Sequence, residues 1–317
     1  MEPNAHFNAD IEAFLLNAGT LEIDTRHGLS ELARYFQELQ ARAAGVAYSE
    51  LGISTRRDSA RPQILEVADT PGVYTFASAY DLRNPEQKVK PGSIALLKLS
   101  GVMRSESGIS TRGMDALSED LRLAYANPNI SGVIIETNSP GGESLAGTLL
   151  RSTITERNKP VVGFGHLVAS AAYRALSAAD EIILSGAGAE AGSIGTMVAL
   201  DAKLIQDLRN RSINIYGTTA PNKNSAGRGI MAGDFLPLQK QVDASTVNFQ
   251  NEVRDSRPLR GTAQTIAETL DGSMWLAQEA KDRGLVDLVG NMQLAIKRVQ
   301  LLSTTMYNTK GRKGQKS

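Results

Sequence analysis

Several residues of this chain are of types that can act in catalysis, and the first candidate is a serine. Ser170 lies in the small-residue run ASAAY (169–173), directly after an apolar stretch that predicts a buried strand. A serine hydroxyl can attack a carbonyl carbon when a base takes its proton. At such a position a serine can also cap the first turn of a helix. Ser170 is therefore a candidate nucleophile, with helix capping as the alternative.

A nucleophilic serine needs a base, and two residues are candidates for it. Lys223 lies in the loop PNKN (221–224), after a predicted strand at 213–216. A lysine base must lose solvent, because the ordinary pKa of its amine is about 10.4. His166 stands four residues before Ser170, but no acidic neighbour in the sequence would orient its ring. Lys223 is the preferred base, with a solvated loop lysine as the alternative.

A pair of glycines follows another predicted strand, in the motif NSPGG (138–142). Two glycines let the backbone approach a ligand closely and point N–H groups at it. Such N–H groups can form an oxyanion hole, which stabilises the negative charge that develops on a carbonyl oxygen. An ordinary strand-to-helix turn built on Pro-Gly is the alternative.

Apolar runs and helical patterns alternate from residue 92 onward. The predicted strands cover 94–99, 133–135, 160–164, 181–184, 213–216 and 285–289, and the predicted helices cover 114–126, 144–157, 170–179 and 275–283. Strands that are apolar on both faces and alternate with helices indicate an α/β fold of parallel βαβ units. Because ligands of such folds gather at the carboxyl ends of the strands, the chemical motifs are expected to share one edge of the sheet.

Composition argues against several classes of function. The 317 residues include 34 basic and 34 acidic ones, so the net charge of zero gives no electrostatic case for nucleic acid or an anionic membrane as the main partner. There is no cysteine, and the three histidines lie far apart, so no disulfide, metal site or cofactor is expected. No apolar run approaches the roughly 20 residues of a membrane span. The N-terminus lacks the pattern of a secretory signal, which predicts a cytoplasmic protein.

The chain is expected to divide into four segments. Residues 1–60 predict a helical N-terminal extension, 61–91 a linker with short strands, 92–304 the α/β domain, and 305–317 a disordered basic tail. The pair Arg56-Arg57 in the extension is a candidate site for self-cleavage. Apolar residues at 238, 242, 249 and 253 form a narrow helical stripe, suited to packing on a sheet or on another subunit.

Taken together, the motifs resemble a known family. NSPGG (138–142), ASAAY (169–173), GSIG (192–195) and Lys223 occur in an order and spacing similar to the signal peptide peptidase A family of serine peptidases, S49, in the ClpP/crotonase superfamily. The segment AKDRGLVD (280–287) also looks like the family's. The resemblance covers roughly residues 92–290. It implies repeated ββα and βαβ units around a mostly parallel sheet, with 92–304 as the peptidase domain.

The resemblance implies a serine endopeptidase with a serine–lysine dyad. Ser170 would form the acyl-enzyme, and Lys223 would be the general base. The backbone N–H groups of Gly142 and Ala171 would form the oxyanion hole. Ser193 would support the site without acting directly.

The resemblance also implies partners. Family members assemble as rings or domes and act on protein or peptide substrates, so a homo-oligomer is expected in which the lysine can reach the serine of a neighbouring subunit. The stripe at 238–253 is then a candidate assembly surface. Lys203, the next candidate lysine, falls in a predicted helix and is expected to point outward. The layout resembles the phage and prophage branch, whose members process capsid scaffold or portal proteins, and the location would then be the host cytoplasm.

Two other functions fit the same fold. A crotonase-like acyl-CoA enzyme would also use glycine N–H groups as an oxyanion hole, and would need an acidic residue for which Glu143 and Glu190 are suitably placed. A catalytically inactive assembly protein would keep the fold and oligomerise without Ser170-dependent cleavage.

Overall fold

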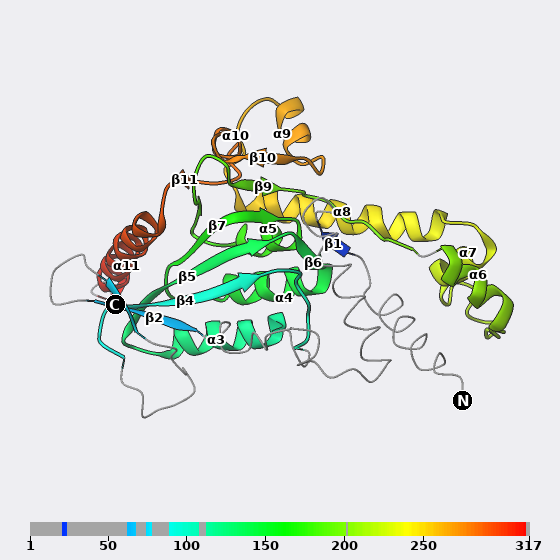
Figure 1. Cartoon of the computed structure of the whole chain (residues 1–317), viewed down its shortest axis with the longest axis horizontal. Helices are drawn as coiled ribbons and strands as arrows, with labels where there is room; N and C mark the ends of the chain where they lie inside the picture. Colours follow the sequence, from blue (N-terminus) through cyan, green and yellow to red (C-terminus); the bar gives the residue numbers. More distant parts are fainter. Residues whose placement is uncertain are drawn as a thin grey trace, which may run out of the picture.

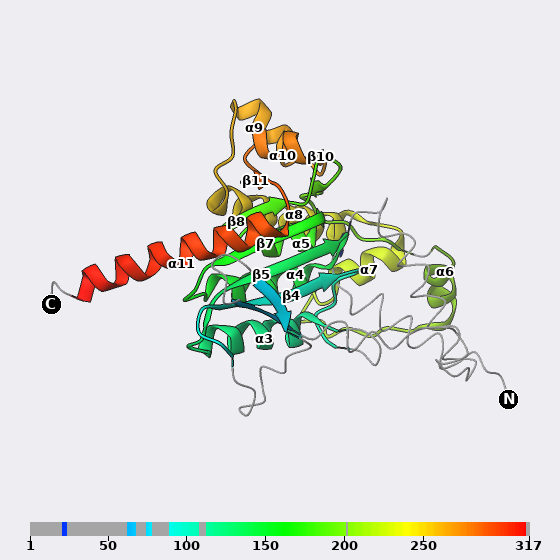
Figure 2. The same cartoon turned by 60° about the vertical axis from the view of Figure 1, so that its left-hand side comes forward.

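A nine-stranded sheet forms the centre of the protein, with helices packed on both of its faces (Figures 1 and 2). The computed structural model describes residues 21–23, 62–67, 74–77, 89–107, 112–200 and 202–314. The sheet has the order β10-β9-β7-β5-β4-β2-β3, with β8 paired to β7 and β11 paired to β8. Its strands are β2 (Gln63–Val67), β3 (Tyr74–Ala77), β4 (Ser93–Ser100), β5 (Ile130–Ser139), β7 (Val161–Ala169), β8 (Glu181–Leu184), β9 (Glu190–Gly192), β10 (Met274–Leu276) and β11 (Leu288–Val289).

The middle of the sheet is parallel. Strands β4, β5 and β7 are parallel neighbours, and β7 pairs in parallel with β8 along its first half and with β9 at its carboxyl end. Among the described residues of this sheet, antiparallel pairing occurs toward its two ends: β2 pairs with β3 and β4, and β10 pairs with β9. The predicted α/β class with a mostly parallel sheet is confirmed. Strands β2 and β3, from the segment predicted as a linker, are part of this sheet.

The apolar runs of the sequence become strands that are buried on both faces. Along β5, Val133 and Ile135 join the larger core, while Ile134 between them joins the core on the opposite face. Helices α3 (Met114–Ala126), α4 (Ser144–Thr155) and α5 (Ala171–Leu176) contribute to the larger core. Because successive side chains of a strand point to opposite faces, a doubly covered strand must be apolar at consecutive positions.

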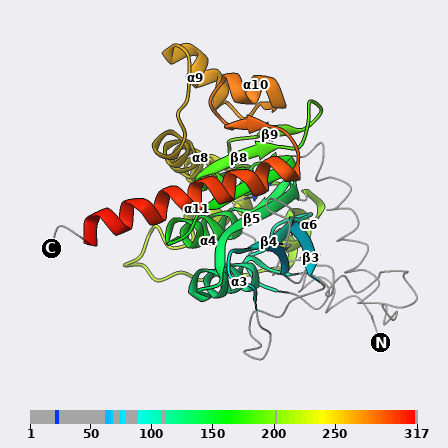
Figure 3. The same cartoon turned by 90° about the vertical axis from the view of Figure 1, so that its left-hand side faces the viewer.

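Helix α11 (Met292–Gly314) covers the other face and crosses the sheet in Figure 3. A Cβ atom added to Gly132 on β5 would stand 2.5 Å from Cγ1 of Val299, so the helix rests directly on the strand. The helix continues to Gly314, whereas the sequence predicted disorder from residue 305. Its first turns are anchored by buried side chains, and a nucleated helix adds residues at little cost.

An arm made of α6 (Ala202–Arg211), α7 (Ser225–Ala232) and the first half of α8 (Leu236–Ser256) lies beyond the end of the sheet (Figure 1). The predicted strand at 213–216 is wrong. These residues form no strand, and the side chains of Ile213 and Ile215 are 91% and 93% exposed. Local strand propensity does not form a strand here, because the segment lies on the arm, away from any sheet edge that could pair with it.

Predictions for the two ends of the chain can also be compared with the structure. The predicted helix at 275–283 begins instead as β10, and the helix proper is α10 (Ala277–Asp282) after α9 (Ala263–Thr269). Gly284, at a φ of +80°, ends α10 as expected for a C-terminal cap.

The predicted extension over 1–60, with its Arg56-Arg57 site, lies outside the described residues except for β1 (Leu21–Ile23). None of the described helices is both long enough and apolar enough to cross a membrane.

Candidate active site

Three of the predicted motifs meet at the carboxyl edge of neighbouring parallel strands. The NSPGG motif follows β5, Ser170 follows β7, and the GSIG motif begins at the end of β9. These strands lie side by side in the order β9-β7-β5. The backbone N–H of Ser170 donates to the carbonyl oxygen of Gly192 at 2.9 Å, which ties two of the motifs together. The expectation that the motifs share one edge of the sheet is therefore met for these three.

Ser170 stands in a strained turn between β7 and α5. Its φ is 54° and its ψ is −122°, a conformation that costs energy for any residue other than glycine. It occupies the N-cap position of α5, yet its side chain makes no capping hydrogen bond. The residue is only 1% exposed. A strained serine between a strand and a helix is the arrangement of the nucleophile elbow of hydrolases, so this geometry favours a nucleophile over a cap.

The glycine pair forms the short strand β6 (Gly141–Glu143), which runs beside the backbone of Met103. A Cβ atom added to Gly142 would lie 2.2 Å from the carbonyl oxygen of Met103, so no larger residue fits without moving the loop. Ala171 is fully buried as the first residue of α5. The N–H groups at the start of a helix have no partner within the helix, which leaves them available to a ligand.

Lys223 is placed differently from the other predicted site residues. It lies in the turn before α7, on the arm, and its side chain is exposed. Its backbone N–H donates to the carbonyl oxygen of Ala220 at 3.0 Å. Within the described part of one chain, no hydrogen bond or ion pair connects its amine to Ser170. Lys203 on α6 is exposed as well, as the sequence predicted.

The remaining candidate residues make contacts of their own. Ser193 follows β9 with a φ of 54°, and its N–H donates to the carbonyl oxygen of Ser273 at 2.9 Å. The exposed ring of His166 contacts Oγ of Ser185 through Nδ1 at 3.2 Å. The carboxylate of Glu143 accepts hydrogen bonds from the N–H and the Oγ of Ser105, each at 2.7 Å. Glu143 therefore fastens the glycine loop to the segment after β4.

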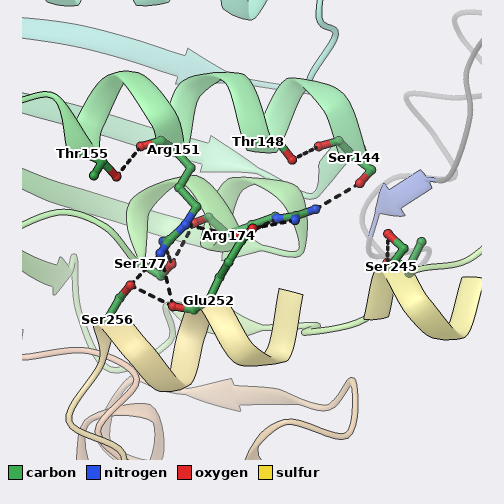
Figure 4. A network of polar contacts seen from close by, with 10 residues as sticks. Ser144, Thr148, Arg151, Thr155, Arg174, Ser177, Ser245, Glu252 and Ser256 are labelled. Carbon is green, nitrogen blue, oxygen red and sulfur yellow. Dashed lines mark hydrogen bonds and ion pairs between the residues drawn. The ribbon is translucent and has the colours of Figure 1, made fainter. Parts of the chain in front are cut away.

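A buried polar network next to the helix that follows Ser170 was not predicted from the sequence (Figure 4). Arg174, four residues after Ser170, forms a two-pronged ion pair with Glu252 of α8, with N···O distances of 2.8 and 2.9 Å. It also donates to Oγ of Ser144 at the start of α4. Arg151 of α4 contacts the same carboxylate at 3.2 Å. The network joins α4, α5 and α8.

This network connects α5, the helix that follows Ser170, to α8, the helix that extends into the arm. Arg174 lies within α5, and Glu252 lies on the same helix that carries the arm away from the sheet. Burial lowers the pKa of Arg151, although the nearby carboxylate of Glu252 opposes that shift. The signal available in the sequence was an arginine inside an otherwise apolar helix, which must find a partner when it is buried.

Replacing Glu252 with glutamine is expected to lower the free energy of unfolding by about 2–4 kcal/mol, because the guanidinium of Arg174 would stay buried without its counter-charge. The side chain of Arg174 is 6% exposed. Urea denaturation followed by circular dichroism measures the change. The matched control is Glu279→Gln, whose ion pair with Arg283 involves a carboxylate that is 52% exposed. The control is expected to change stability by about 0.5 kcal/mol or less. Equal losses in both variants would contradict the role given to the network.

The described residues contain no group of three or more histidine, aspartate or glutamate side chains that could hold a metal ion. The groups that the structure places at this edge of the sheet are the hydroxyl of Ser170 and backbone N–H groups.

Comparisons with known proteins show that this chain is similar to proteases. Residues 153–305 match the model of Peptidase family S49, which confirms the resemblance seen in the motifs. Protease 4 of Haemophilus influenzae is 27% identical over 234 residues, which is 69% of this chain and 36% of the relative. Capsid assembly protease C of Escherichia phage lambda is 27% identical over 267 residues, which is 78% of this chain and 58% of the relative.

The chain thus spans just over a third of the length of the Protease 4 relative. Among solved structures, a ClpP1 variant from Listeria monocytogenes aligns with a TM-score of 0.41 and 15% identity, over 63% of this chain and 94% of that one.

Proposed function

We propose that this chain is a serine endopeptidase with Ser170 as its nucleophile. Residues 153–305 match the model of Peptidase family S49. The observation that supports this most is the strained strand-to-helix turn at Ser170, beside a glycine strand whose backbone cannot accept a side chain. Relatives that carry protease names favour this function over the acyl-CoA alternative. So does the carboxylate of Glu143, which is already engaged by Ser105.

In the proposed reaction, a neutral lysine amine takes the proton of the Ser170 hydroxyl as Oγ attacks the scissile carbonyl. The N–H groups of Gly142 and Ala171 stabilise the oxyanion of the tetrahedral intermediate. The peptide C–N bond breaks, and the leaving amine receives the proton from the lysine. A water molecule then hydrolyses the acyl-enzyme by the same route. Ser193, next to Ser170 through Gly192, holds the loop after β9 in place.

The base in this proposal is Lys223 of a neighbouring copy. In a single copy Lys223 is exposed on the arm, whereas a lysine base must be desolvated. Docking of the arm onto the active-site edge of another copy would supply that desolvation. The arm also exposes large apolar side chains, among them Ile213, Ile215 and Phe235, as a surface does that is covered in an assembly. A homo-oligomeric ring or dome would both desolvate Lys223 and cover the exposed apolar side chains of the arm.

The proposed substrates are protein segments in an extended conformation, and we include capsid scaffold or portal proteins among them. This finer statement is supported by the similarity to Capsid assembly protease C, which extends over 78% of the chain. A protease of this kind would act in the host cytoplasm, where capsids assemble.

A cleavage assay read by mass spectrometry tests the proposal. Purified protein is incubated with an unfolded protein and, separately, with a phage scaffold protein, and a calorimetric titration with coenzyme A runs in parallel. The expected result is cleavage of internal peptide bonds, faster for the scaffold, without binding of coenzyme A. Intact substrates together with coenzyme A binding would support the acyl-CoA alternative. Intact substrates without such binding would support an inactive assembly protein.

A further inference from the structure

The chain pairs a strand of its own N-terminal segment with the glycine strand of the active site. Strand β1 (Leu21–Ile23) runs antiparallel to β6, with Leu21 opposite Glu143, Glu22 opposite Gly142 and Ile23 opposite Gly141 (Figure 1). The two strands form a small sheet of their own, apart from the central sheet. This pairing joins residues that are far apart in the sequence, so it is a specific contact and not a local turn.

The hydrogen bonds of β6 show which side of Gly142 faces β1. The N–H of Met103 donates to the carbonyl oxygen of Gly141 at 2.8 Å, and the N–H of Glu143 donates to the carbonyl oxygen of Met103 at 3.0 Å. Because the polar groups of successive residues in a strand point to opposite sides, the N–H and C=O of Gly142 point away from Met103 and toward β1. The N–H assigned to the oxyanion hole therefore faces the backbone of Glu22.

Strand β1 also lies against α4 and against α5, the helix that begins directly after Ser170. An extended segment is thus held by backbone pairing at the oxyanion strand and stands beside the nucleophile turn. Addition of an extended peptide to an open strand edge is a common mode of peptide recognition, in which main-chain hydrogen bonds supply the affinity. In the described part of the chain, β1 is the strand that fills this edge of β6.

We propose that Leu21–Ile23 is an internal peptide ligand of the active site, which occupies the edge of β6 and must leave before a protein substrate can pair there. This inference rests on the proposed function, since it assigns a regulatory role to the same site. The ligand class is an extended peptide that is bound through its backbone, and Leu21–Ile23 is a peptide of this class within the chain itself. Displacement of β1 exposes the N–H of Gly142 and thereby completes the oxyanion hole.

A disulfide lock tests this proposal, because the natural chain has no cysteine that could compete. Leu21 and Glu143 are directly opposite each other, next to the pair Glu22 and Gly142, whose backbone groups face each other. Leu21 and Glu143 therefore form the closer kind of antiparallel pair, and their Cα atoms are expected about 4.5 Å apart. That spacing suits a disulfide. In the double variant Leu21→Cys, Glu143→Cys, oxidation is expected to form the bond, which mass spectrometry detects, and to lower kcat/KM at least about tenfold. A reducing agent is expected to return the activity to that of Glu143→Cys alone, the matched control, which lacks the same carboxylate and whose activity the oxidant does not change.

A binding measurement makes the test independent of catalysis. A fluorescent peptide with the sequence of residues 17–27 is titrated into the double variant in a Ser170→Ala background. The reduced protein is expected to bind the peptide, and the oxidised protein to exclude it. If the wild type cleaves nothing, the proposed function fails while this binding measurement still decides the role of β1. Failure of the disulfide to form, or equal peptide binding in both redox states, would overturn the inference.

A second pair of variants checks the backbone contact itself. Glu22→Pro removes the N–H that faces Gly142, whereas Glu22→Ala keeps it. The proline variant is expected to cleave a protein substrate with at least about fivefold higher kcat/KM, and the alanine variant to match the wild type. In the Ser170→Ala background, the proline variant is expected to bind the peptide more tightly. Unchanged peptide binding in the proline variant would contradict a role for β1 as an internal ligand.

Discussion

Replacing Ser170 with alanine is expected to reduce kcat/KM by roughly 10³-fold or more while the protein keeps its fold. The hydroxyl is the atom that forms the acyl-enzyme, and no neighbouring residue can replace it in that strained turn. The variant keeps the N–H groups of Gly142 and Ala171, so substrates are expected to bind with similar affinity. Steady-state kinetics on a protein substrate, with circular dichroism to confirm folding, measure this effect.

Two matched controls make the Ser170 result specific. Ser185→Ala removes another serine hydroxyl, one that contacts Nδ1 of the His166 ring at 3.2 Å. His166→Asn removes the alternative base. Both variants are expected to keep kcat/KM within about threefold of the wild type, because surface substitutions away from the site have small effects. A large loss in His166→Asn would favour a serine–histidine pair over the proposed lysine.

Replacing Lys223 with methionine is expected to abolish cleavage to a similar degree, because the serine hydroxyl would lose its base. Methionine keeps much of the length of the side chain and removes the amine. The exposed Lys203 gives the matched control, since Lys203→Met removes an amine that the proposal does not use. Kinetics on the assembled protein, with its size checked by light scattering, separate a catalytic loss from a failure to assemble.

Mixing the two inactive variants tests whether the base comes from another copy. If Ser170 and Lys223 of one site belong to different copies, dissociated and reassembled mixtures of Ser170→Ala and Lys223→Met contain some intact sites. For equal amounts and random assembly, activity is expected to return to about a quarter of the wild-type value. A dyad within one copy would give no recovery, since each copy would then lack one of its two members.

The sequence predicted the parts of the fold that depend on local patterns. The apolar runs that became β4, β5, β7 and β8 are buried on both faces, so their composition alone marks them as strands. The motifs that follow β5, β7 and β9 could be placed at one edge because parallel strands share a direction. The segment 213–216 has similar local character but lies on the arm, and this could not be read from its composition.

The features that the sequence could not predict are contacts between distant segments. Arg174 and Glu252 are 78 residues apart, and no periodicity relates an arginine of α5 to a carboxylate of α8. The pairing of β1 with β6 spans most of the N-terminal half of the chain, and three residues are too few to show a strand pattern. The position of Lys223 relative to Ser170 depends on the arm, which no local pattern describes.

The central claim is that Ser170 is the nucleophile, and covalent labelling tests it most directly. A fluorophosphonate reacts with an activated serine, so that an O–P bond forms at Oγ and fluoride leaves. After incubation of the wild type, peptide mapping by mass spectrometry is expected to show one adduct, on the peptide that contains Ser170. Ser170→Ala is expected to show none. An adduct at another residue, or cleavage that continues in the labelled protein, would contradict the assignment of Ser170.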